Sequence, residues 1–372
     1  MKKIGLVMTG GGARAAYQAG VVRALYEIMG SRSRLFDIIT GNSAGAINAT
    51  YLAAHAENWD VATQNLMELW QRLSPANVFD TRTRVLSEIG VKWISGTIFG
   101  GLTLQGSQVN HLLDTKPLRK LIKRETDFSQ IQKNIEAGHL SGISLTTTNY
   151  TTGSSVIFYQ TGDDVPNWSR SDRFSVKCEL DEDHLMASAA IPFFFPPVQI
   201  GQSFYGDGCI RQTTPLSPAI HLGSDKLIAV GIRYPTPRER MRENTFMPSQ
   251  NPTLGQIVGT MMNAIFLDSL ESDYERLNRI NQHTADGTSE LKQIPILMLR
   301  PSQDLGKLAQ NLPDKLPPFL RYLFKGMGVS DYEGTDLMSY LAFDKSYTGP
   351  LIALGYEDTI KRKAEVLEFI GA

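Results

Sequence analysis

Ser43 is the residue whose surroundings most clearly suggest nucleophilic chemistry. The apolar pair Ile38–Ile39 leads into the turn-forming run Gly41–Gly45, and small helix-forming residues follow. This order predicts a strand, a sharp turn and a helix, with the serine hydroxyl projecting from the turn at the positive end of the helix dipole. Because Gly41 and Gly45 lack a Cβ atom, the helix can cross close to the strand. The pattern also occurs in plain turns, so Ser43 is a candidate nucleophile that still requires a base and an oxyanion hole.

A second candidate site is the glycine triplet Gly10–Gly12, which follows an apolar run and opens a helix. Such a row of backbone N–H groups binds an anion, which could be a cofactor pyrophosphate or the oxyanion of acyl transfer. The spacing from Gly10 to Ala15 matches the dinucleotide fingerprint, but that fingerprint also requires an acidic residue at the end of the second strand. Here Asp37 begins that strand and the Ser43 turn ends it. The sequence therefore favours an oxyanion hole beside Ser43, because loops at one edge of an open α/β sheet form its sites.

Asp207 is the candidate base. A serine hydroxyl needs a neighbouring base to take its proton, but none of the six histidines lies in a distinctive motif. Asp207 differs, because it ends a short strand and the flanking Gly206 and Gly208 leave its carboxylate open to approach. An Asp-Gly pair is also a favoured surface turn, and that alternative stays open. The usual α/β-hydrolase arrangement is disfavoured, because several strands precede its nucleophile and one clear strand precedes Ser43.

The elements that must position these residues alternate between strands and helices. The opening of the chain predicts a strand over Lys3–Thr9, a helix ending at Gly30, a strand over Phe36–Thr40 and a helix over Ala44–Glu57. This order predicts an α/β fold in which helices cover both faces of a mainly parallel sheet. Farther along, we predict helices over Trp59–Leu73, His111–Lys123, His184–Ala190 and Leu254–Ile280, a hairpin of Ile143–Tyr150 and Ser155–Tyr159, and strands over Ser203–Tyr205, Lys226–Arg233 and Ile294–Arg300.

Length and composition exclude several classes of protein. The 372 residues suffice for one large domain or two ordinary ones, and the net charge of −1 gives no reason to expect nucleic-acid binding. Two cysteines, Cys178 and Cys209, favour a reduced cytoplasmic setting over a disulfide scaffold. The N-terminal apolar run is too short for a signal peptide, and no run of about 18 apolar residues could cross a bilayer. We expect a cytoplasmic protein that contacts membrane surfaces transiently; the oligomeric state is not indicated.

The segment Thr81–Leu112 is apolar but interrupted by several glycines, which disfavour a helix. Two interpretations remain open. The segment is either a core loop beneath a cap, or a mobile lid or lipid-facing flap at the mouth of an acyl pocket.

Five stretches of sequence together resemble the patatin-like phospholipase family. They are GGGARAAYQAGVVRAL, GNSAGAINA, ASAAIPFFFPPV with the DG that follows, LLDTKPLR, and DLMSYLAFDKSYTGPLIALGYED. The resemblance covers nearly the whole chain. It implies a three-layer α/β/α sandwich and a lipid acyl hydrolase that uses a Ser-Asp dyad without histidine.

The resemblance also implies roles for individual residues. Ser43 resembles the nucleophile and Asp207 the base, while Gly10, Gly11 and Gly12 match the oxyanion loop and Arg14 its basic position. Further matches are Gly41 and Gly45 in the nucleophile turn, Gly208 and Cys209 in the Asp-Gly motif, and Ser188 and Pro192 in a motif that we interpret as structural. Cys209 stands where the family usually has Gly or Ala, and it would be strained if that position required a positive φ.

These assignments define a mechanism and its alternatives. Ser43 attacks an acyl ester while Asp207 accepts its proton directly, which requires burial to raise the pKa of Asp207 from about 3.9. We expect a fatty acyl ester of a (lyso)phospholipid or related lipid as substrate. The alternatives are an acyl thioesterase using the same dyad, a lipid- or nucleotide-binding regulatory module and, more remotely, a dinucleotide-dependent oxidoreductase. No cofactor is expected. No metal is expected either, because the consecutive residues of the cluster Asp181–His184 cannot all face one ion. Residues 1–300 should form the catalytic domain and residues 301–372 a mostly helical segment packed on it.

Overall fold

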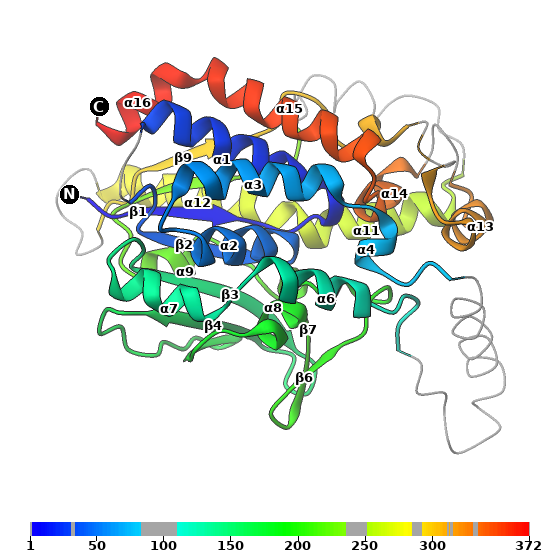
Figure 1. Cartoon of the computed structure of the whole chain (residues 1–372), viewed down its shortest axis with the longest axis horizontal. Helices are drawn as coiled ribbons and strands as arrows, with labels where there is room; N and C mark the ends of the chain where they lie inside the picture. Colours follow the sequence, from blue (N-terminus) through cyan, green and yellow to red (C-terminus); the bar gives the residue numbers. More distant parts are fainter. Residues whose placement is uncertain are drawn as a thin grey trace.

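A mainly parallel β-sheet runs through the centre of the chain (Figure 1). The computed structural model describes residues 2–30, 34–82, 110–235, 251–284, 292–310, 312, 315–329 and 334–371. Among these residues nine strands form one sheet, in which β5-β4-β3-β2-β1-β8-β9 are neighbours in that order. The strands are β1 (Ile4–Met8), β2 (Ile38–Asn42), β3 (Gly142–Asn149), β4 (Ser155–Thr161), β5 (Arg173–Lys177), β6 (Val198–Ile200), β7 (Ser203–Asp207), β8 (Lys226–Val230) and β9 (Ile296–Leu299).

The strands β9, β8, β1, β2 and β3 are parallel to one another, and β4 pairs antiparallel with β3. One edge of β3 is shared by two strands. The last pair of β2 with β3 joins Asn42 to Thr146, and the next residue of β3, Thr147, pairs with Asp207 of the antiparallel strand β7. Because β4 occupies the other edge of β3, the carboxyl ends of β2 and β7 meet head to head.

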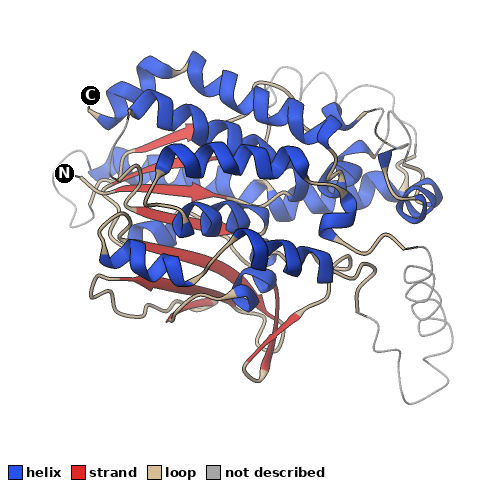
Figure 2. Cartoon of the chain, in the orientation of Figure 1, coloured by secondary structure: helices blue, strands red, loops and turns tan. Residues whose placement is uncertain are grey.

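Helices cover both faces of the sheet (Figure 2), as the sequence predicts. Neighbouring residues of β1 point to opposite faces of the sheet and pack in different hydrophobic cores. Leu6 packs with residues of α1, α2 and α15, whereas Val7 packs with residues of α9 and α12. The helices are α1 (Ala16–Met29), α2 (Ala44–Ala54), α3 (Trp59–Arg72), α4 (Pro75–Val78), α6 (Lys116–Glu125), α7 (Ser129–Glu136), α8 (Glu182–Ser188), α9 (Ser217–His221), α11 (Leu254–Phe266), α12 (Asp268–Thr284), α13 (Pro318–Gly326), α14 (Thr335–Leu341), α15 (Lys345–Lys361) and α16 (Lys363–Ile370), with 3-10 turns η1 (Gly12–Ala15), η2 (Gly208–Ile210) and η3 (Lys307–Ala309).

The three-layer α/β/α arrangement and the early β-α-β-α order are confirmed, but several details differ. The helix predicted over His111–Lys123 begins only at Lys116, and the short helices α7 and α9 have no counterpart in the prediction. The predicted single helix Leu254–Ile280 is divided into α11 and α12 at Leu267, and Asp268 opens the second helix with an acidic first turn. The short strands β5 and β6 were not predicted, since their burial does not alternate cleanly. The central part of the segment Thr81–Leu112, residues 83–109, lies outside the described residues.

The helix α15, near the end of the chain, lies along α1, near its beginning (Figure 1). Two glycines allow this approach. A Cβ atom on Gly20 would stand 2.0 Å from the carbonyl oxygen of Ile352, and one on Gly355 would stand 2.1 Å from that of Tyr17. The C-terminal helices therefore pack tightly on the N-terminal part of the fold, while the domain boundary at residue 300 stays a prediction.

We predict that Gly355→Ala lowers the free energy of unfolding by about 1–3 kcal/mol, because its methyl group has no room against α1. The matched control is Gly349→Ala in the same helix, where a Cβ atom would meet no other atom within 4 Å. This control should raise the free energy of unfolding by about 0.5–1 kcal/mol through helix propensity. Urea denaturation of both variants measures the difference, and equal stabilities would contradict the close helix contact.

Candidate active site

Ser43 lies at the junction of β2 and α2 in a strained backbone conformation, with φ 53° and ψ −133°. Its N–H group donates to the carbonyl oxygen of Ser188 at 3.1 Å and to Ser188 Oγ at 3.2 Å. The Ser188 hydroxyl in turn donates to the carbonyl oxygen of Thr146 at 2.7 Å. Positive φ is rare for a non-glycine residue and persists where the surroundings fix it. Ser188 thus holds the turn, which agrees with the structural role expected for its motif.

Gly41 and Gly45 let α2 begin directly above the sheet. A Cβ atom on Gly41 would stand 2.5 Å from the Gly45 carbonyl oxygen, and one on Gly45 would stand 2.2 Å from that of Met8 at the end of β1. Any side chain at these two positions would push the helix away from the strands. The turn predicted from the sequence around Ser43 therefore has the expected sharp geometry.

Asp207 is fully buried at the end of β7, next to this turn. Its Oδ1 accepts a hydrogen bond from the Cys209 N–H at 2.9 Å, whereas Oδ2 has no partner among the described residues. Burial raises the pKa of Asp207 to about 6, although the nearby Ser43 hydroxyl and the Cys209 N–H act to lower it. At neutral pH the carboxylate is ionised and keeps one oxygen available. It has the properties of a general base for Ser43.

The glycine loop lies against the other side of Ser43. A Cβ atom on Gly10 would stand 2.3 Å from Ser43 Cβ and 3.0 Å from its Oγ, so the loop backbone touches the serine. Gly12 has φ +56°, and a Cβ atom there would stand 2.1 Å from the Tyr340 carbonyl oxygen. The N–H groups of Gly11 and Gly12 have no acceptor among the described residues. They are the unsatisfied donors that an oxyanion hole requires.

Arg14 is buried beside the loop, but its donors point toward the C-terminal segment. Nε donates to Ser339 Oγ at 2.7 Å, and Nη2 donates to Asp336 Oδ1 at 2.7 Å. The guanidinium also stacks over the Tyr340 ring, 4.5 Å from its centroid. Burial alone would lower the pKa of Arg14, but Tyr340 and Asp336 raise it overall, so the charge is retained. Since its backbone N–H donates to Gly11, Arg14 fastens the glycine loop to α14 rather than facing an oxyanion.

Cys209 is not strained, contrary to the concern raised by the sequence. It lies in the 3-10 turn η2 and is not among the residues with positive φ. Burial raises the pKa of its thiol well above the usual value, and the Asp207 carboxylate adds to the rise. Its sulfur would be 2.6 Å from a Cβ atom on Gly10, so the thiol fills the space between the glycine loop and Asp207. Gly208, whose Cβ would meet the Thr146 carbonyl oxygen at 2.2 Å, keeps η2 close to β3.

None of the six histidines, all within the described residues, hydrogen-bonds to Ser43. His184 pairs with Asp181 at 2.6 Å, and His221 stacks on Trp168. Among the described residues no group of three or more His, Cys, Asp or Glu side chains could hold a metal ion. Within those same ranges, no helix is long and apolar enough to span a membrane.

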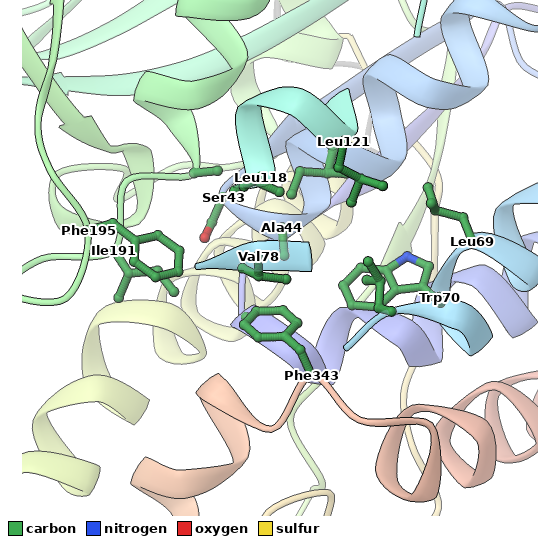
Figure 3. Close-up of a pocket in the computed structure, with 14 residues that line it drawn as sticks. Ser43, Ala44, Leu69, Trp70, Val78, Leu118, Leu121, Ile191, Phe195 and Phe343 are labelled. Atoms are coloured by element: carbon green, nitrogen blue, oxygen red, sulfur yellow. The ribbon is translucent and has the colours of Figure 1, made fainter. Parts of the chain in front are cut away.

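An apolar pocket opens beside the Ser43 hydroxyl (Figure 3). In Figure 3, Ile191 and Phe195 lie on one side of the serine and Trp70 and Leu121 on the other. The lining is almost entirely hydrocarbon and comes from six parts of the chain: Gly12, Ser43, Ala44, Ile47, Leu69, Trp70, Leu73, Val78, Leu118, Leu121, Ala189, Ile191, Phe195 and Phe343. The sequence predicts amphipathic helices here but not which residues line a pocket, because a buried apolar residue has the same pattern whether it faces a core or a cavity.

Comparison with known proteins places the chain in a family. Residues 6–220 match the Patatin-like phospholipase family, which is more than half of the chain. The chain therefore belongs to the patatin-like phospholipase family. Membership supports a lipid acyl hydrolase activity. The comparison with curated proteins returned no match.

Three solved structures are similar to the chain. They are VipD from Legionella pneumophila (13% identity, TM-score 0.35, covering 98% of this chain and 67% of that one), the type III effector ExoU of Pseudomonas aeruginosa (13%, 0.32, 96% and 54%), and human GIVD cytosolic phospholipase A2 in complex with methyl gamma-linolenyl fluorophosphonate (11%, 0.44, 100% and 58%). The chain thus spans about half to two thirds of the length of these structures.

We predict that the rate at which a fluorophosphonate labels Ser43 rises with pH and levels off above the pKa of Asp207, about 6. The reason is that a carboxylic acid acts as a base only after losing its proton, so activity is lost as pH falls through this pKa. Stopped-time labelling between about pH 4 and about pH 9 measures the profile. In Asp207→Asn the step should vanish and the plateau rate should fall by about a hundredfold or more. A step that persists in this variant would assign the base elsewhere.

Proposed function

We propose that the protein hydrolyses fatty acyl esters of (lyso)phospholipids or related lipids through a Ser43–Asp207 dyad and an acyl-enzyme. The observation that carries the proposal is the arrangement around Ser43. A buried carboxylate with one unpartnered oxygen lies on one side of it, and backbone N–H groups without acceptors lie on the other. An apolar pocket of the kind that suits an acyl chain adjoins them.

In the first half-reaction Ser43 Oγ attacks the ester carbonyl carbon and its proton passes to Asp207. The N–H groups of Gly11 and Gly12 stabilise the resulting oxyanion, each worth about 3 kcal/mol by analogy with other oxyanion donors. When the tetrahedral intermediate collapses, the bond to the leaving alcohol breaks and Asp207 returns the proton to it. In the second half-reaction Asp207 takes a proton from water, which attacks the acyl-enzyme and releases the fatty acid.

The pKa of about 6 suits Asp207 to both roles. A lower value would leave the carboxylate too weak a base, and a much higher one would leave it protonated at neutral pH. A direct dyad of this kind needs no histidine, and Arg14 acts as a positioning residue through α14. The pocket lining includes no charged side chain, so we infer that a charged headgroup stays outside the pocket while the acyl chain enters it.

We predict that Ser43→Ala and Asp207→Asn each lower kcat at least about a thousandfold on a lysophospholipid, because the two groups act as a unit. His221→Ala and His283→Ala serve as controls and should change kcat by no more than about twofold, since neither ring contacts the site. Fatty acid release is measured, with circular dichroism to verify folding. Loss of activity in a histidine variant together with an active Asp207→Asn would refute the dyad.

We predict that kcat/KM is higher for lysophospholipid and nitrophenyl acyl esters than for an acyl-CoA of the same chain length. A thiolate leaves without needing a proton, so a thioesterase with this dyad would show the opposite order and retain thioester turnover in Asp207→Asn better than ester turnover. A regulatory module without catalysis would show no labelling of Ser43 by a fluorophosphonate. These measurements therefore distinguish an ester hydrolase, a thioesterase and a non-catalytic binding module.

A further inference from the structure

The apolar pocket beside Ser43 is bounded by Trp70. Figure 3 shows the indole on the side of the pocket away from the serine, with Leu69 and Leu121 near it. Trp70 is only 1% exposed, so protein and not solvent lies behind its ring. The ring stacks on that of Phe343, with 6.5 Å between the centroids and 21° between the planes. An acyl chain that starts at Ser43 and runs along this side of the pocket therefore meets a wall.

A chain of buried hydrogen bonds fixes the indole. Trp70 Nε1 donates to Asn48 Oδ1 at 2.7 Å, and Asn48 Nδ2 donates to Gln18 Oε1 at 2.9 Å. Gln18 Nε2 donates in turn to the carbonyl oxygen of Thr9, the residue before the glycine loop, at 2.7 Å. Asn48 and Gln18 are fully buried, and a buried network whose members all have partners holds them in one arrangement. Trp70 is therefore a rigid wall and not a side chain that turns aside for a ligand.

The same helix carries a second tryptophan without such an anchor. Trp59, at the start of α3, is 3% exposed and packs edge-on against Phe36, with 5.7 Å between the ring centroids. Among the described residues its Nε1 has no hydrogen-bond partner, and Trp59 is not one of those that line the pocket. A tryptophan that only fills the core thus needs no polar anchor in this helix. The anchor of Trp70 suits a ring that must keep its place where one side borders a pocket.

The path from Ser43 to this wall is short. It follows α2, since Ala44 and Ile47 of that helix line the pocket and Asn48, the next residue, holds the indole. Asn48 lies five positions after Ser43, which corresponds to about 7.5 Å along a helix axis. With C–C bonds of about 1.5 Å, an extended acyl chain covers that distance with roughly six to eight carbons. The tails of membrane lipids are about twice as long, since each spans about 15 Å of the bilayer.

We propose that Trp70 sets the length of acyl chain that the pocket accepts, so that the gain in kcat/KM with chain length ends at about eight carbons. Shorter chains bury each added methylene group against α2, α3 and α6, whereas carbons beyond this length find no room past the indole. The proposal rests on the proposed function, because it names the acyl group that is cleaved at Ser43. Trp70 determines specificity and takes no part in the chemistry.

The test is the dependence of kcat/KM on acyl length, measured with nitrophenyl butyrate, octanoate and dodecanoate below their critical micelle concentrations. In the unaltered protein kcat/KM should rise from butyrate to octanoate by up to about fourfold for each buried methylene group, and then stay level or fall. Trp70→Leu makes room for further methylene groups and should raise the ratio of kcat/KM for dodecanoate to that for octanoate about tenfold.

Two further variants keep the test decisive should Trp70→Leu fail to fold. Trp70→Phe keeps an aromatic ring against Phe343 and should shift the same ratio in the same direction by a smaller factor. Ile47→Phe narrows the path between Ser43 and the indole, and should lower the ratio of kcat/KM for octanoate to that for butyrate about tenfold.

The matched control is Trp59→Leu, the same change at a buried tryptophan of the same helix away from the pocket lining. It should leave each length ratio within about twofold of the unaltered protein, because lost stability alone affects all esters alike. Circular dichroism verifies the folding of every variant. The proposal is overturned if Trp70→Leu leaves the ratios unchanged, which would put the acyl chain on the side of Ile191 and Phe195, or if Trp59→Leu changes them equally.

Failure of the proposed function gives a different result. Isothermal titration of the Ser43→Ala protein with octanoic and dodecanoic acid measures the pocket without catalysis. The affinity should be no higher for dodecanoic than for octanoic acid, and adding Trp70→Leu should reverse this. If no ester is hydrolysed but the binding shift is seen, the proposed hydrolysis is wrong and the assignment of Trp70 stands. If neither is seen, the assignment of Trp70 is overturned as well.

Discussion

The edge of β3 that β2 and β7 share is the constraint on which the rest of the site depends. Asn42 is the last residue of β2 paired to this edge, and Asp207 ends β7 one position farther along it. Because the carboxyl ends of the two strands point toward each other along β3, the turn that follows β2 lies next to the last residue of β7. The Ser43 turn and the Asp207 end of β7, which come from distant parts of the chain, are thereby placed next to each other by the ladder hydrogen bonds to β3.

Several locally unfavourable features follow from this junction. Ser43 adopts a positive φ, Asp207 is buried with one unpartnered oxygen, and Gly11 and Gly12 keep unused N–H groups. Each costs stability in the free protein, and each is held by contacts elsewhere: Ser188 on the turn, Cys209 on the carboxylate, Arg14 on the glycine loop. Clustering of strain and unsatisfied groups at one place is the expected mark of a site that gains its missing partners from a substrate.

The turn at Ser43 and the glycine loop could be predicted from the sequence, because their conformations depend mainly on neighbouring residues. The glycines around Ser43 and the triplet at Gly10–Gly12 indicate a sharp turn and an anion site without knowledge of the rest of the chain. The β-α-β-α order similarly predicts the layers of the fold. Asp207 could be proposed only from the glycines beside it and from the family resemblance, since its place depends on the antiparallel pairing of β7 with β3.

The pocket lining and the exposed apolar side chains could not be predicted, because a hydrophobic pattern indicates that a segment is mostly buried but not where each of its side chains lies. Phe343 lines the pocket and Met261 is exposed, yet both lie in apolar stretches that look alike in sequence. Arg14 matches the basic position of the oxyanion motif, but its guanidinium donates hydrogen bonds to α14. Its partner Ser339 lies 325 residues farther along the sequence. Long-range polar contacts of this kind leave no local signal.

The most direct measurement is a crystal structure of the protein after reaction with a long-chain alkyl fluorophosphonate. The account predicts phosphorus bonded to Ser43 Oγ, a phosphonyl oxygen within hydrogen-bonding distance of the Gly11 and Gly12 N–H groups, the Asp207 carboxylate adjacent to Oγ, and the alkyl chain between Trp70 and Leu121. A phosphonyl oxygen directed away from the glycine loop, or a carboxylate out of reach of Oγ, would contradict it.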